Sequence, residues 1–91
     1  MVSLEEMKQY LRVDFADDDA LISSLISSSI KLCQSVARVE TQREINKYQD
    51  ELKTAVLYTV AYLYENRENA DHKALTLTIR SLLFGIRKAE F

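Results

Sequence analysis

The segment LKTAVLYTVAYLY, residues 52–64, decides the fold. Ten of its thirteen residues are apolar or tyrosine, and it contains neither proline nor glycine. At about 100° per residue these side chains point in nearly every direction around a helix, and the side opposite Leu52 carries Ala55, Tyr58 and Tyr62. A helix that is apolar all round must be covered all round. We therefore expect this segment to lie at the centre of the structure, with the Tyr58 and Tyr62 side left for another subunit.

The composition points to helices throughout the chain. Its 91 residues include one glycine and no proline, and 47% of them are hydrophobic. So few turn-forming residues exclude β-sandwiches and barrels, and the length fits one domain. We expect an all-α, four-helix single domain over residues 1–91, with one long central helix. The expected helices cover about residues 4–12, 19–37 and 74–88, plus a helix of up to 25 residues that starts after Thr41 and bends near residues 47–50.

Helix caps set the expected boundaries. Ser3 with Glu6, and Thr41 with Glu44, have the spacing of capping boxes. The three aspartates at 17–19 are expected to cap the second helix and offset its dipole, and Asp71 is expected to cap the last one. Phe15, between the first two helices, is expected to pack inward. Residues 75–79 alternate like a strand, so the start of the last helix is open to either a helical or an extended structure.

The last helix has apolar residues on two sides. Its expected inward stripe consists of Leu75, Ile79, Leu82, Leu83 and Ile86. Leu77 and Phe84 lie on the opposite side, next to Arg80 and Arg87. An apolar pair among charges is typical of a partner-binding surface. We therefore expect subunit or partner contacts at six residues: Tyr58, Tyr62, Leu77, Arg80, Phe84 and Arg87.

Charge and hydropathy exclude several classes of protein. Twelve basic and 14 acidic residues give a net charge of −2, which provides no general attraction for nucleic acid. No secretory signal is recognisable, and the longest uncharged runs have 11 residues, about half of what a membrane-spanning helix needs. We therefore expect no membrane association and a location in the cytosol.

Catalytic or metal chemistry has little support. Cys33, the one cysteine, falls on the apolar side of the second helix, where a small buried hydrophobe is the expected role. His72, the one histidine, lies in a polar stretch with no partner for catalysis. The aspartates at 17–19 lack the spacing of a calcium loop. We expect no enzyme activity, no cofactor, no metal site and no small-molecule substrate.

DNA binding is the alternative to a structural role that the sequence leaves open. The chain is helical, and Arg80, Arg87 and Lys88 form a modest basic strip on its last helix. These features leave open a small DNA-binding regulator of the helix-turn-helix type, although the glycine turn between short helices is missing.

The order of the sequence blocks resembles the small head–tail connector proteins of long-tailed bacteriophages, which are also labelled possible DNA-packaging proteins. The first block is Ser3 to Asp14, SLEEMKQYLRVD, followed by the acidic residues 17–19 and by LISSLI at 21–26. The second runs from Glu51 to Glu68 and contains YENRE at 64–68, and the last is SLL at 81–83 followed by Arg87. Many members have a Gly-Arg turn where this chain has Ala37-Arg38-Val39, and many have proline near 84–85.

This resemblance implies an all-helical subunit in a ring of about a dozen copies. The ring would lie in the virion neck beneath the portal protein, contact a tail-side completion protein, and continue the DNA channel from head to tail. DNA would pass through it transiently and without sequence specificity. A slightly acidic subunit fits that role, because a channel without excess positive charge lets a polyanion slide.

Overall fold

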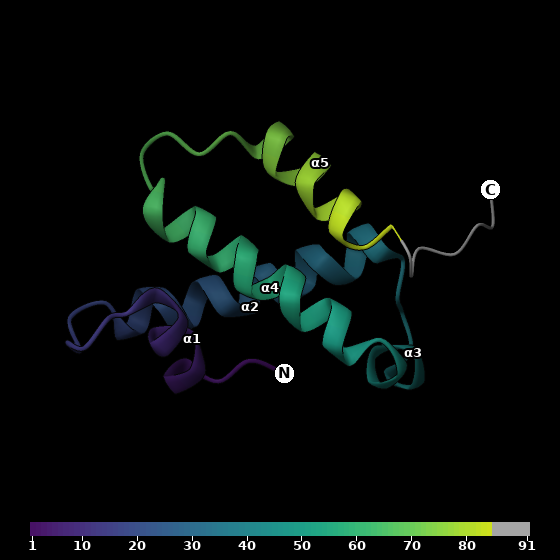
Figure 1. Ribbon diagram of the computed structural model, residues 1–91, viewed down its shortest axis with the longest axis horizontal. Coiled ribbons are helices and arrows are strands. Elements are labelled where there is room, and N and C mark those ends of the chain that lie inside the picture. The colour runs from purple at the N-terminus through teal and green to yellow at the C-terminus, as the bar shows by residue number, and fades with distance from the viewer. Residues whose placement is uncertain (85–91) are drawn as a thin grey trace.

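The computed structural model describes residues 1–84 and shows five helices within them (Figure 1). They are α1 (Leu4–Leu11), α2 (Asp19–Ala37), α3 (Gln42–Lys47), α4 (Gln49–Glu65) and α5 (His72–Leu82). The all-α class is confirmed. The expected Ile86, Arg87 and Lys88 end of the last helix lies outside the described residues.

Helices α2 and α4 form the centre of the fold (Figure 1). They cross with the most extensive packing in the molecule, α5 packs against both of them, α1 also contacts both, and α3 contacts α4. The buried apolar side chains come from four of the five helices and from residues 2, 39 and 83 next to them, whereas α3 has none. They make one hydrophobic core: Val2, Met7, Ile22, Ile26, Cys33, Ala37, Val39, Leu52, Ala55, Val56, Val60, Leu75, Ile79 and Leu83.

The chain breaks into two helices where one was expected. Tyr48 is the C-cap of α3 and the N-cap of α4, with φ −108° and ψ 27°. The four-helix prediction is therefore wrong by one helix, although the break falls within the expected bend at 47–50. No proline or glycine causes it. The Tyr48 ring packs against the core, as does Ile45, so tertiary packing turns the chain here.

Helix α1 is attached by ion pairs to both central helices. Ser3 accepts a hydrogen bond from the Glu6 amide at 3.1 Å, as the capping pattern predicts. The reciprocal half of that box does not form, because the Glu6 carboxylate pairs with Lys53 of α4 instead. Lys8 also pairs with Asp19 of α2 at 2.7 Å. The second predicted box, between Thr41 and Glu44, is complete.

Helix α2 is long and apolar enough, by length and composition alone, to cross a membrane. A core helix of a soluble protein passes the same test. In this fold its apolar side, with Ile22, Ile26 and Cys33, is buried in the core, and most of its serines are exposed. One side of α2 therefore packs in the core, and the side with the exposed serines does not.

Two arginines close helices in a left-handed conformation. Arg12 has φ 61° after α1, and Arg38 has φ 59° after α2. At Arg38 the chain makes the paired bonds of a Schellman turn, from the Arg38 amide to the Ser35 carbonyl at 3.2 Å and from the Val39 amide to the Gln34 carbonyl at 3.0 Å. Residues other than glycine adopt this conformation at a cost, because Cβ crowds the backbone.

Replacing Arg38 with glycine is therefore expected to raise the free energy of unfolding by about 1 kcal/mol. Arg43→Gly is the matched control, because Arg43 is exposed within α3, where glycine costs up to about 1 kcal/mol. Urea unfolding of both variants checks the opposite signs. A destabilised Arg38→Gly variant would contradict the left-handed turn.

Candidate functional site

Helix α5 has an apolar side that faces solvent as well as one that faces the core. Leu75, Ile79 and Leu83 are buried, one turn apart. Leu77 is 53% exposed and Phe84 is 75% exposed. Arg80 and Ser81 lie between them, and these four residues line one surface hollow. We call Leu77, Arg80, Ser81 and Phe84 the α5 outer stripe.

The structure brings together three of the six residues predicted to make contacts. Leu77, Arg80 and Phe84 share the α5 outer stripe, while Arg87 lies outside the described residues. Leu82, which was expected to face inward, is 41% exposed. That expectation is wrong because α4 and α2 cover only the side that carries Leu75, Ile79 and Leu83.

The tyrosine side of α4 is covered by its own chain more than expected. Ala55, on the side predicted to lack cover, is fully buried. Tyr58 and Tyr62 are half-buried against the core, and their rings stack with centroids 6.4 Å apart. The Tyr62 hydroxyl accepts a hydrogen bond from the Asp71 amide at 2.9 Å. Tyr62 therefore holds the α4–α5 connection, and both tyrosines are only partly exposed.

Phe15 faces solvent, contrary to the prediction from the sequence. Its ring was expected in the core, but it is 52% exposed in the connection between α1 and α2. Tyr10 on α1 is exposed to the same degree. The charged residues near Phe15 in the sequence indicate this exposure, because Asp14 and Asp17 on either side disfavour burial of the segment.

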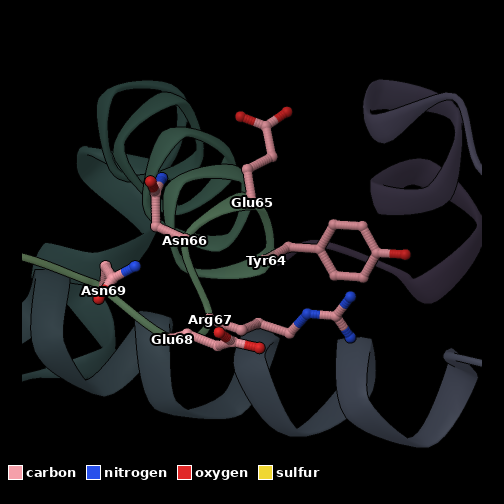
Figure 2. A pocket seen from close by; sticks show the side chains of 6 residues that line it. All are labelled: Tyr64, Glu65, Asn66, Arg67, Glu68 and Asn69. Atoms are coloured by element: carbon pink, nitrogen blue, oxygen red, sulfur yellow. The ribbon is translucent and has the colours of Figure 1, made fainter.

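The YENRE block at 64–68 ends α4 and ties it to the start of α2. The Tyr64 hydroxyl donates a hydrogen bond to the Asp18 carboxylate at 2.5 Å. The Arg67 guanidinium lies 5.0 Å from the centre of the Tyr64 ring, and Figure 2 shows both side chains extending in the same direction. Asn66 donates to the Tyr62 carbonyl at 2.9 Å. This block thus closes the helix and clamps two elements together.

Asp18 does not cap α2 through its side chain, contrary to the expectation for the aspartate run. It occupies the N-cap position without a side-chain cap bond, because its carboxylate is used by Tyr64. Asp19 lies in the first turn and pairs with Lys8. Asp71 does cap α5, accepting from the Ala74 amide at 3.0 Å, as predicted.

A family model for the phage gp6-like head-tail connector protein matches residues 1–89. The chain belongs to this family. No curated protein and no solved structure matches the chain. The family has a structural role in the phage particle, where its members contact head and tail proteins.

In this connector-family chain, the residues capable of catalysis lie apart. Cys33 is fully buried, and burial raises the pKa of its thiol. Its sulfur lies 3.6 Å from the Thr59 hydroxyl. His72 is exposed at the start of α5, and residues 1–84 contain no group of three or more potential metal ligands. Cys33 thus serves as a packed core residue, as the sequence predicts.

The bond between Tyr64 and Asp18 makes stability depend on pH. Because its hydroxyl donates to the Asp18 carboxylate, the pKa of Tyr64 lies above its ordinary value. As pH rises through about 10, tyrosine in the unfolded chain loses its proton first, so the unfolded state binds fewer protons than the native state. The contribution of Tyr64 to stability is therefore present below that pH and is lost above it.

We expect the difference in unfolding free energy between the wild type and Tyr64→Phe to shrink as pH rises from about 8 to about 11. Urea unfolding across this range measures it. The control is the same Tyr64→Phe substitution made in an Asp18→Asn background, which lacks the carboxylate. There the difference in unfolding free energy is expected to depend less on pH. A difference that stays constant with pH in both backgrounds would contradict the role of the Asp18 carboxylate.

Proposed function

We propose that this chain is a subunit of a ring beneath the portal, which links the DNA-filled head to the tail and continues the DNA channel. The observation that carries the proposal is the family match over residues 1–89. The chain acts by packing against its neighbours and has no active site. Its partners are further copies of itself, the portal protein and a tail-side completion protein, in the virion neck after assembly in the host cytoplasm.

The surface of the fold supports an assembly role. Among residues 1–84, three of the six exposed large hydrophobic residues lie in α5 or within two residues of its end: Leu77, Leu82 and Phe84. Aromatic residues and arginine are the types that most often dominate binding energy at interfaces, and the α5 outer stripe contains Phe84 and Arg80. We propose this stripe as the main contact, together with Arg87, which comes later in the sequence, and with the partly exposed Tyr58 and Tyr62 as a smaller contribution.

Portal-bearing, DNA-filled heads that lack this chain provide the test. Purified chain added to them is expected to bind at the portal vertex and to allow tails to join. Phe84→Ser is expected to bind or assemble less well, whereas Thr54→Ser, on the exposed surface of α4, is the control. Heads that accept tails equally well without the chain would contradict the proposal.

Binding to duplex DNA separates this function from the helix-turn-helix alternative. A regulator binds duplex DNA with an affinity that falls steeply with salt. We expect no sequence-specific binding, since a channel component only lets DNA pass. A titration of duplex DNA at low salt checks this. Sequence-specific binding that weakens with salt and is abolished by Arg80→Ala would favour the regulator instead.

A further inference from the structure

A second exposed apolar surface, opposite in charge, lies away from the α5 outer stripe. It is centred on Phe15, in the connection between α1 and α2. Asp14 and Asp17 beside it are exposed, and their side chains have no ion pair or hydrogen bond with any residue from 1 to 84. We call residues 14–17 the acidic loop.

The charges of the two surfaces are complementary. Residues 14–19 include four aspartates and no basic residue, and two of these, Asp18 and Asp19, are already paired within the fold. Helix α5 has no acidic residue and carries Lys73 and Arg80. Lys73 precedes Leu77 by four residues, so it extends the same side of the helix. Opposite charges around apolar groups steer and align two partners.

The two surfaces cannot meet within one molecule. In Figure 1 the α1–α2 connection lies at one end of the long axis, and the C-terminal end of α5 lies towards the other. A contact between two different surfaces on two copies is heterologous, and it leaves a free surface of each kind for the next copy. Repetition of such a contact gives a closed ring when the rotation between copies closes.

We propose that the acidic loop of one copy docks on the α5 outer stripe of the next copy. Phe15 enters the hollow beside Phe84, and the two exposed aspartates of the loop face Lys73 and Arg80. The occupant of the stripe is therefore a second copy of this chain. This inference rests on the proposed function and specifies the contact that builds its ring.

Two single variants each remove one half of the contact. Phe15→Ser impairs the acidic loop and keeps the stripe, whereas Phe84→Ser impairs the stripe and keeps the loop. Both side chains are largely exposed, so the fold should survive, and circular dichroism checks it. Each variant is expected to raise the dissociation constant for self-association at least about 30-fold, as loss of a central anchor does. Native mass spectrometry over a concentration series measures this.

Mixing the two variants tests whether the contact is heterologous. One variant is isotopically labelled, so that mixed species are distinguished by mass. An intact loop from Phe84→Ser can still dock on an intact stripe from Phe15→Ser. The mixture is therefore expected to form mixed dimers and to stop there, while each variant alone stays monomeric at the same concentration.

Charge reversal provides a second measurement. Arg80→Asp is expected to weaken self-association about two- to five-fold, as for a solvent-exposed ion pair. Asp17→Arg is expected to weaken it similarly, and combining the two in one chain should restore part of the loss.

The possible outcomes separate this inference from the proposed function. If the wild type assembles and Phe15→Ser assembles equally well, the acidic-loop contact is wrong and the ring proposal stands. If Phe84→Ser loses self-association and mixing it with Phe15→Ser forms no mixed dimers, α5 makes a different contact and the inference is also overturned. If the wild type does not self-associate, either free or on portal-bearing heads, both proposals fail.

Discussion

Replacing Leu75 with alanine is expected to lower the free energy of unfolding by about 2–5 kcal/mol. Leu75 is 1% exposed and anchors α5 on the central helices. Its removal would take away buried apolar surface and leave a cavity where the α5 side chains meet α4 and α2. Urea unfolding followed by circular dichroism measures the loss.

Leu77→Ala is the matched control, because it is the same substitution two residues along the same helix. Leu77 is 53% exposed, so its removal is expected to change stability by about 0.5 kcal/mol or less while weakening self-association. Equal losses of stability in the two variants would contradict the assignment of an inner and an outer side to α5.

The second large effect is a gain in stability. Ser29 is fully buried in α2, and its hydroxyl has no hydrogen-bond partner among residues 1–84. A buried hydroxyl without a partner costs about 1–3 kcal/mol. Ser29→Ala is therefore expected to raise the free energy of unfolding by that amount, with the higher helix propensity of alanine adding to it.

Ser28→Ala separates the two sources of that gain. Ser28 is the preceding residue of the same helix and is exposed, so only helix propensity acts there, worth about 0.5 kcal/mol. Thermal unfolding of both variants measures the difference. A gain at Ser29 no larger than that at Ser28 would show that the buried hydroxyl finds a partner.

Helix periodicity predicted most of the fold. The inward positions of Leu75 and Ile79 and the central place of residues 52–64 follow from apolar spacing, and the Thr41 and Asp71 caps follow from local sequence. These features depend on residues within one or two helical turns, which is the range over which a sequence pattern carries direct information.

Features set by distant contacts could not be predicted in the same way. The break at Tyr48 depends on packing against the core, since no residue near it interrupts a helix by itself. Asp18 looked like a cap, but its partner Tyr64 lies 46 residues away. The cover on the tyrosine side of α4 depends on how the other helices pack against α4, which helix periodicity does not determine.

Only the helical part of the candidate site could be predicted from the sequence. Leu77 and Phe84 stood out as apolar residues on the polar side of a helix, and the structure places them in one hollow with Arg80. Phe15 lies in a connection, where no periodicity indicates which way a side chain points. Its flanking aspartates carried the information that the apolar pattern lacked.

Electron cryomicroscopy of the chain bound to portal-bearing heads tests the central claim most directly. We expect a closed ring of copies at the portal vertex, with Leu77, Arg80 and Phe84 of each copy buried in a protein contact. A vertex without the chain, or a ring in which these three side chains face solvent, would contradict it.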